Sequence, residues 1–268
     1  RGRSDGYGGF CWHGDNNLHL LSAGEKITKE GFMGLRLQRG GGAGLSRPDL
    51  SVCMIVKDEA LNICDSLKSL SPLGAQIIVV DTGSRDGTPE LALAEGAKLF
   101  TFEWCDDFSA ARNESLAHSD GRWIMWFDAD DRLPEQSVAA IRDMAKTKAD
   151  KGLLFWVQNM PEGMEWLQLR MCPNRPGVQF RGTIHEQLVY SLDEQNIPLV
   201  EYPQVKIYHH GYTEAHLQPA KRERNYTMLQ KELETKPDDF RLLLQIAECC
   251  LDRGEMFMAE LYFERALK

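Results

Sequence analysis

Between residues 50 and 148, the sequence alternates between short apolar runs and segments with the spacing of amphipathic helices. The apolar runs show no regular alternation with polar residues, which is typical of strands buried on both faces of a sheet. Strands and helices that alternate in this way predict parallel βαβ units. We therefore predict an α/β fold with a mostly parallel sheet flanked by helices. The predicted strands cover 50–56, 76–80, 98–102 and 122–127, and the predicted helices cover 59–69, 88–95, 109–119 and 134–148.

The helix starts and the later strands are predicted from local signals. Thr88 and Ser109 are the predicted N-caps of two of the helices, because short hydroxyl side chains favour that position. Residues 152–157 and 165–170 read as the two strands of a hairpin, and residues 205–208 as a further strand.

Carboxylates follow two of the predicted strands at the point where each strand ends. Asp128, Ala129 and Asp130 follow the fourth predicted strand, and Asp81 follows the second. Open α/β sheets build nucleotide sites at the carboxyl ends of their strands. Two carboxylates two residues apart can both reach one hard cation such as Mg²⁺ or Mn²⁺, which can neutralise a diphosphate leaving group. The alternative for these acids is a solvent-exposed turn.

The overall composition excludes several classes of protein. A net charge of −9 argues against a nucleic-acid partner, because such proteins usually carry a basic surface. The seven cysteines are an odd number without a Cys-x-x-Cys pair, which favours scattered thiols in a reducing compartment over zinc sites or disulfides. No apolar run approaches the roughly 18 residues that span a bilayer, and residues 1–9 lack the apolar core of a signal peptide. We therefore expect a cytoplasmic protein without a membrane partner.

Three segments of different composition divide the chain. Residues 1–48 are glycine-rich and are expected to be a flexible segment, either an unrelated tail or a fusion in which Cys11 would be an acceptor thiol. Residues 49–217 form the α/β domain, and residues 218–268 are helical. Small and aromatic residues of the last segment match the spacing of a tetratricopeptide repeat counted from Phe240: Ala247, Gly254, Ala259, Phe263 and Ala266. A generic pair of amphipathic helices is the alternative.

Four blocks of the sequence, in this order, carry a resemblance to a known family: 51–59, 78–84, 102–113 and 126–130. They resemble family 2 glycosyltransferases of the GT-A, Rossmann-like fold, in the branch with C-terminal tetratricopeptide-like helices. Peptide S- and O-glycosyltransferases of glycocin pathways are similar. The resemblance covers residues 49–268 and implies an inverting hexosyltransferase. It further implies a UDP-sugar donor, Mn²⁺ or Mg²⁺, and a peptide or protein acceptor. We also expect that the helical segment can form a homodimer.

The resemblance assigns roles to individual residues. Asp128, Asp130 and one histidine of the pair His209 and His210 would hold the metal. Neighbouring side chains of a strand point to opposite sides, so only one of the two can ligate, and we predict His210. Asp131 would support the ligands, and Asp81 would contact the uridine. The donor would be held by residues of the strand ends and of the 109–119 helix: Val56, Asp58, Glu59, Asp81, Ser84, Arg112, Asn113, Asp128, Ala129 and Asp130.

The loop 181–186 would lie on the acceptor side, with Glu186 as the general base and His185 as the second candidate. Arg170, Asn174 and Arg175 precede this loop and could reach the donor phosphates. One of the tryptophans could form the floor of the sugar pocket.

Each of these residues could instead have a purely structural role. Asp81 could cap its own turn, Arg112 could form a structural ion pair, and Glu186 could form a salt bridge within its loop. At the level of function, a nucleotidyltransferase also uses paired aspartates, but the glycine-rich phosphate loop typical of that class is missing after the first strand. Two further functions fit the same residues: a glycosyltransferase acting on a glycan or small molecule, and an inactive scaffold with a transferase fold.

Overall fold

The structure of the chain is a computed structural model that describes residues 47–211 and 218–268, with side chains from residue 222 onward in the second range. The chain divides into two units, residues 1–46 and 47–268, and the second contains all described residues. The predicted glycine-rich linker and Cys11 lie outside the described residues.

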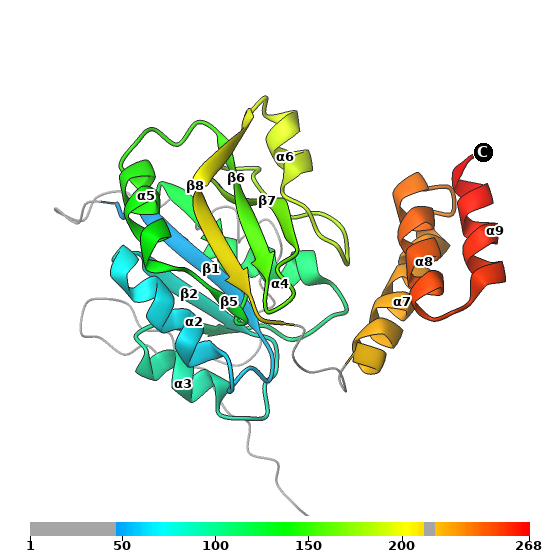
Figure 1. Cartoon of the computed structure of the whole chain (residues 1–268), viewed down its shortest axis with the longest axis horizontal. Coiled ribbons are helices and arrows are strands. Elements are labelled where there is room, and N and C mark those ends of the chain that lie inside the picture. Colours follow the sequence, from blue (N-terminus) through cyan, green and yellow to red (C-terminus); the bar gives the residue numbers. More distant parts are fainter. Residues whose placement is uncertain (1–46, 212–217) are drawn as a thin grey trace, which may run out of the picture. The chain divides into compact units, whose positions relative to one another are not determined.

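A single sheet of eight strands forms the centre of the α/β domain (Figure 1). The strands are β1 (Leu50–Val56), β2 (Gln76–Asp81), β3 (Lys98–Thr101), β4 (Trp123–Trp126), β5 (Asp131–Arg132), β6 (Gly152–Asn159), β7 (Glu165–Pro173) and β8 (Leu199–His209). Their order across the sheet is β3-β2-β1-β4-β7-β6-β8-β5. Strands β1 to β4 pair in parallel, which confirms the predicted βαβ units, and β7 joins them antiparallel to β4.

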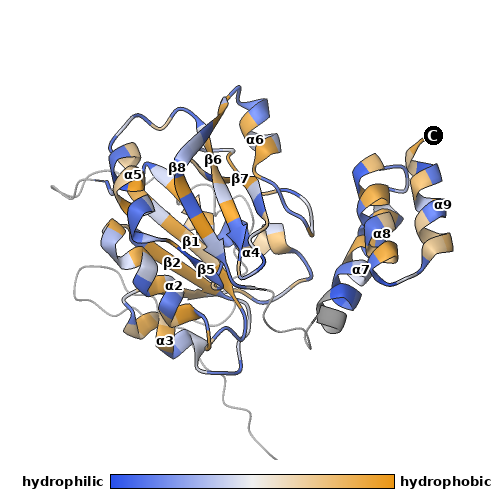
Figure 2. Ribbon diagram, viewed as in Figure 1, coloured by the Kyte–Doolittle hydropathy of each residue, from blue (hydrophilic) through white to orange (hydrophobic). Residues whose placement is uncertain are grey.

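Helices cover both faces of this sheet, which explains why its central strands are apolar without alternation. The helices are α2 (Ile63–Leu70), α3 (Thr88–Ala94), α4 (Phe108–Ala117), α5 (Glu135–Ala145) and α6 (Val189–Glu194). Residues of α2, α3 and α5 share one buried cluster with Val52 and Met54, whereas α4 and α6 share another with Cys53. Figure 2 shows the apolar residues along the strands and the polar residues in the loops that join them.

Three local predictions were wrong. The first helix begins at Ile63 rather than Glu59, because residues 59–62 form a turn in which Glu59 O accepts from the backbone N–H of Asn62 and Ile63. Thr88 lies inside α3, and its Oγ1 accepts a hydrogen bond from Glu59 N at 2.8 Å. Asp107 rather than Ser109 caps α4 by accepting from Ala110 N at 2.9 Å. The hydroxyls of Thr88 and Ser109 are both engaged by other loops, Thr88 Oγ1 by Glu59 N and Ser109 Oγ by Gly182 O at 2.6 Å.

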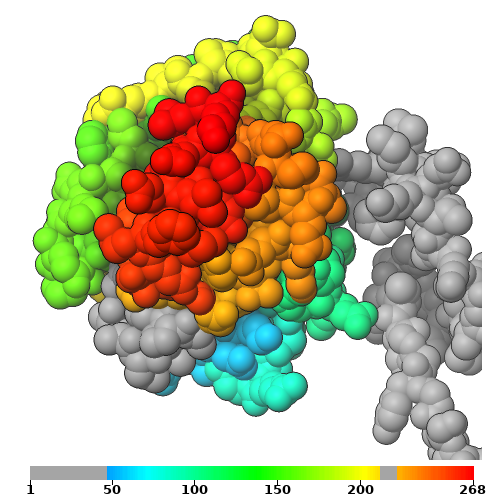
Figure 3. Space-filling view, turned by 90° about the vertical axis from the view of Figure 1, so that its right-hand side faces the viewer, coloured from blue at the N-terminus to red at the C-terminus, as the bar shows by residue number. Residues whose placement is uncertain are grey.

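The C-terminal segment consists of α7 (Gln218–Thr235), α8 (Phe240–Asp252) and α9 (Met256–Ala266). These helices share a buried cluster that includes Leu229, Ile246 and Ala259. Figure 3 shows the outer surface of α8 and α9 in orange and red. Whether this pair is a tetratricopeptide repeat stays a prediction. No helix in the described part of the chain has the length and hydropathy that a bilayer-spanning helix needs.

Candidate metal and nucleotide site

A cavity of about 480 Å³ lies where the carboxyl ends of β1, β2 and β4 meet the end of β8. It brings together most of the residues predicted for the donor and the metal. Those that line it are Val56, Asp58, Glu59, Arg112, Asp128, Ala129, Asp130 and His210. Asp81, Ser84, Asn113, His185 and Glu186 do not line it.

Asp128 is held between two arginines. Its Oδ1 accepts from Arg112 Nη2 at 2.9 Å, and its Oδ2 lies 3.8 Å from Arg170 Nη1. Both guanidinium groups stack over the ring of Trp126, at 4.5 Å for Arg112 and 3.8 Å for Arg170. Burial alone would raise the pKa of Asp128, but the two arginines outweigh it and hold this pKa below its usual value. Asp128 is therefore an ionised and firmly oriented carboxylate.

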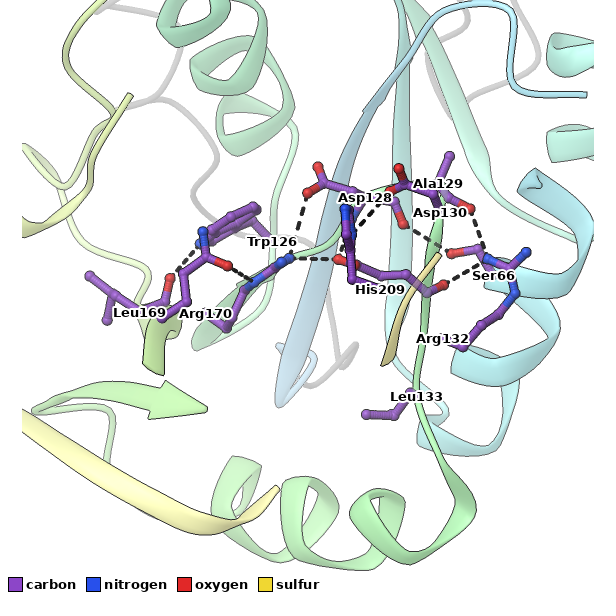
Figure 4. A network of polar contacts seen from close by, with 12 residues as sticks. Ser66, Trp126, Asp128, Ala129, Asp130, Arg132, Leu133, Leu169, Arg170 and His209 are labelled. Carbon is purple, nitrogen blue, oxygen red and sulfur yellow. Dashed lines mark hydrogen bonds and ion pairs between the residues drawn. The ribbon is translucent and has the colours of Figure 1, made fainter. Parts of the chain in front are cut away.

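Asp131 and His209 are brought together by the pairing of β5 with β8, in which the two residues lie opposite each other. Figure 4 shows His209 next to Asp128 and Asp130. Asp131 is fully buried, and its Oδ2 accepts from Arg170 Nη1 at 2.7 Å. Its Oδ1 accepts from His209 Nδ1 at 2.9 Å. A carboxylate cannot donate, so Nδ1 carries the proton and Nε2 carries the lone pair of the neutral ring. A histidine fixed by a carboxylate in this way is typical of metal ligands.

The imidazole beside the acids is thus that of His209, whereas the prediction named His210. His210 donates its backbone N–H to Asp130 O at 2.9 Å and also lines the cavity. Burial, Arg132 and His209 lower the pKa of His210. The pKa of His209 is raised, because its hydrogen bond to Asp131 and the neighbouring carboxylates outweigh the effect of burial. The register of β5 on β8 places His209 opposite Asp131, and the sequence does not contain that register.

Asp130 is the carboxylate of this group that has no arginine partner among the described residues. Burial, and then the charge of Asp128, raise its pKa to about 7, although His209 acts in the opposite direction. Its Oδ1 lies 3.6 Å from His209 Nδ1. A partly buried carboxylate among other carboxylates is destabilised when ionised, so the position favours a bound cation.

The donor atoms present fit a divalent cation. Asp130, Asp131 and His209 each offer a ligand atom within 4.8 Å of the others. Both oxygens of Asp131 are already used by Arg170 and His209, so Asp130 Oδ2 and His209 Nε2 are the atoms best placed to ligate. Carboxylate oxygen suits Mg²⁺ and Mn²⁺, and imidazole nitrogen is a common ligand of divalent first-row transition metals.

Gly211 has no side chain, and this keeps the space next to Asp130 Oδ2 and His209 Nε2 open. A methyl group at this position would overlap Asp130 Oδ2 and would stand 2.7 Å from His209 Nε2. We therefore expect Gly211→Ala to weaken Mn²⁺ binding at least about tenfold, because either ligand must rotate away. Gly87→Ala is the matched control, since its methyl group would meet only Leu91 Cδ1, at 4.0 Å. Calorimetric titration with Mn²⁺ measures both variants, and unchanged affinity in Gly211→Ala would contradict this geometry.

The loops after β1 and β2 are joined by hydrogen bonds beside the cavity. Asp58 N donates to Ser84 Oγ at 2.8 Å, and Asp58 Oδ1 accepts from Arg85 N at 2.7 Å. Asp81 accepts from the backbone N–H of Gly83 and Ser84 at 3.0 and 3.1 Å, so its carboxylate caps its own turn. A contact between Asp81 and the uridine stays a prediction.

Asn113 faces the 178–187 loop. Its amide exchanges two hydrogen bonds with the backbone of Phe180, at 2.8 and 3.0 Å. Asn174 and Arg175 donate to backbone carbonyl groups of Ser119, Gly121 and Ala149. Asn174 and Arg175 therefore lie near the amino end of β4, and neither they nor Arg170 line the cavity.

Glu186 and His185 point in different directions. Glu186 Oε1 accepts from Arg112 Nε at 2.5 Å, so one guanidinium group links Glu186 to Asp128. His185 has a φ of 52° and lines a second cavity of about 410 Å³, together with Arg181, Tyr190 and Lys236. The structure therefore places only Glu186 next to the predicted donor site.

Sequence reasoning missed the roles of Arg170, Trp104, Phe108 and Arg224. Arg170 pairs with Asp131, and the other three line the main cavity. A signal for Arg170 was present, because an arginine within an apolar strand needs a buried acid as its partner. No local signal marks Arg224, which lies on a different segment of the chain.

Comparison with known proteins identifies the family. The model of glycosyl transferase family 2 matches residues 51–191. A TPR repeat-containing protein of Synechococcus elongatus is 33% identical over 235 residues, which are 84% of this chain and 58% of that protein. The SPbeta prophage-derived glycosyltransferase SunS of Bacillus subtilis is 24% identical over 200 residues, 72% of this chain and 47% of SunS. The chain thus spans about half the length of the curated relatives that it matches.

Two solved structures share the fold. S. aureus TarS 1-349 in complex with UDP-GlcNAc has a TM-score of 0.52 at 14% identity, over 75% of this chain and 71% of that chain. The mannosyltransferase PcManGT from Pyrobaculum calidifontis in complex with GDP-Man and Mn²⁺ has a TM-score of 0.51 at 15% identity, over 88% of this chain and 79% of PcManGT. These likenesses confirm the predicted GT-A fold. With the family model covering residues 51–191, the conclusion is that this chain belongs to glycosyl transferase family 2.

Proposed function

We propose that this protein is a metal-dependent inverting glycosyltransferase that transfers a hexose from a UDP-sugar to a Cys, Ser or Thr side chain of a peptide or protein. The proposal of a bound metal and a nucleotide-sugar donor rests on the group of Asp130, Asp131 and His209 at the edge of the 480 Å³ cavity. The complexes of TarS with UDP-GlcNAc and of PcManGT with GDP-Man and Mn²⁺ support a nucleotide-sugar donor and a metal.

Different residues would bind the metal, orient its ligands and accept the proton of the acceptor. Asp130 and His209 would hold Mn²⁺ or Mg²⁺, whose positive charge stabilises the departing diphosphate. Asp131 orients His209 through its hydrogen bond, and Arg112 and Arg170 keep Asp128 ionised beside them. The carboxylate of Glu186 would accept the proton of the acceptor nucleophile, which attacks the anomeric carbon from the face opposite the diphosphate.

The peptide acceptor is inferred from the resemblance to peptide glycosyltransferases and from the helical segment that follows the domain. Helical repeats present extended surfaces on which polypeptides bind. The S. elongatus relative is named for TPR repeats, and it extends beyond the region that this chain matches.

Incubation of the purified protein with Mn²⁺, a panel of UDP-sugars and peptides that contain Cys, Ser or Thr tests the proposal. We expect one peptide class to gain the mass of one hexose, and we expect EDTA to prevent it. The anomeric configuration of the product, read by NMR, reports on inversion. Transfer to a glycan alone would refute the peptide acceptor, and a protein that does not bind UDP in the presence of Mn²⁺ would be an inactive scaffold.

A further inference from the structure

Arg224 of α7 lines the same cavity as Asp130, although it belongs to the helical segment. Its guanidinium group lies 5.1 Å from the centre of the Phe108 ring, and Phe108 in turn packs edge-on against Trp104 at 4.8 Å. Both aromatic residues also line the cavity. One wall of the cavity therefore consists of two aromatic rings with a cation against them.

Among the described residues, no carboxylate neutralises this arginine. Its hydrogen bonds go to the side-chain oxygen of its neighbour Asn225, at 2.9 and 3.2 Å. Within residues 47–211 and 218–268, its guanidinium group forms no ion pair with a carboxylate within 4.0 Å. Arg112, by contrast, is already shared between Asp128 and Glu186. Among the described residues, the cavity lining contains three lysine and arginine side chains: Lys57, Arg112 and Arg224. Of these, Arg112 is paired with carboxylates, so Lys57 and Arg224 are the two whose charge can interact with a ligand.

Hydrogen bonds to two loops of the α/β domain hold α7 in this position. Glu232 of α7 accepts hydrogen bonds from the backbone N–H and the hydroxyl of Thr183. Lys231 donates to Asp106 Oδ2 at 2.8 Å, in the loop that carries Trp104. Lys231 and Glu232 lie two turns from Arg224 along the same helix, so they fix its approach to the cavity.

The charges of the cavity indicate which ligand needs this cation. Acids dominate the lining at Asp58, Glu59, Asp128 and Asp130, and these repel an anionic ligand. A nucleoside diphosphate carries more negative charge than one divalent cation can offset, and arginine is well suited to phosphate because its planar guanidinium group donates two parallel hydrogen bonds. We propose that Arg224 binds the diphosphate of the nucleotide donor, so that the helical segment completes the donor site. This inference rests on the proposed function.

Titration of Arg224→Ala with UDP and with uridine, each in the presence of Mn²⁺, tests the proposal. We expect the affinity for UDP to fall about tenfold or more, since a charge-assisted contact is lost, and the affinity for uridine to stay unchanged. Arg224→Lys should recover part of the loss. Arg222→Ala is the matched control on the same helix, because Arg222 is exposed and donates to Asp252 O outside the main cavity. It should bind UDP like the wild type.

A role limited to packing gives a different pattern. If Arg224 only anchors α7 on Phe108, then Phe108→Leu and Arg224→Ala should reduce the binding of UDP and uridine alike, and the proposal is overturned. It is also overturned if Arg224→Ala binds UDP normally but loses a peptide acceptor. Failure of the proposed function looks different from both, because the wild type itself would then not bind UDP with Mn²⁺.

Discussion

Replacing Asp130 with asparagine is expected to abolish Mn²⁺-dependent UDP binding and to lower the rate of sugar transfer by roughly 10³-fold or more. The same change is expected to make the metal-free protein more stable at pH 8. The first effect follows from the loss of the carboxylate that faces His209 Nε2 across Gly211. The second follows because burial, and then the negative charge of Asp128, raise the pKa of this carboxyl group in the folded protein.

The sign of the stability effect comes from the two pKa values of Asp130. Its pKa is about 7 in the folded protein and 3.8 in the reference state, so folding favours the protonated form. The cost of ionisation is absent below the unfolded-state pKa, grows as the pH rises, and is complete above about 7. At 1.36 kcal/mol for each pKa unit, this cost is at most about 4 kcal/mol. Asparagine cannot ionise and therefore avoids it.

Thermal unfolding at pH 4 and pH 8, with and without Mn²⁺, measures both effects. Without metal, Asp130→Asn should unfold several degrees above the wild type at pH 8 and close to it at pH 4. Mn²⁺ should stabilise the wild type but not the variant. Asp143→Asn is the control, because Asp143 is 76% exposed on α5. A wild type whose stability does not respond to Mn²⁺ would refute the metal site.

Replacing Glu186 with glutamine is expected to lower the rate of transfer by about 10²–10⁴-fold while UDP binding stays near that of the wild type. The amide of glutamine can still accept the hydrogen bond that Arg112 Nε donates to Glu186 Oε1. It cannot take up a proton at neutral pH. The variant therefore separates a catalytic base from a residue that only positions Arg112 and Asp128.

Single-turnover rates of Glu186→Gln, His185→Ala and the control Glu194→Gln decide between these roles. Glu194 is an exposed carboxylate that pairs with Arg181 near the same loop. A nearly normal rate in Glu186→Gln would leave Glu186 a positioning role, and a loss confined to His185→Ala would move the base to the histidine. A thiol acceptor ionises more easily than a hydroxyl, so a rate that levels off above about pH 8.5 would favour S-linked transfer.

Much of the fold could be predicted because its signals are local. The bounds of β1 agree with the prediction to the residue, and β2, β3 and β4 agree within one or two residues. The apolar runs of these strands are continuous because helices cover both faces of the sheet, and the crossovers between them have helical periodicity. Helix starts were less predictable at 88 and 109, because Thr88 Oγ1 accepts from Glu59 N and Ser109 Oγ donates to Gly182 O, and both partners lie in distant loops.

For the site, the position of Asp128 and Asp130 at the carboxyl end of a strand could be predicted, because the strand and its acids are contiguous in the sequence. Which histidine lies opposite Asp131 depends on how the strands pair in the folded chain. The pairing of Asp131 with His209 spans 78 residues, and its register belongs to the contact between β5 and β8. The contact of Arg112 with Glu186 and the position of Arg224 in the cavity also join segments that are far apart in the sequence. Such contacts depend on how distant segments pack, and a side-chain pattern with a period of two or 3.6 residues carries no information about the partner across the fold.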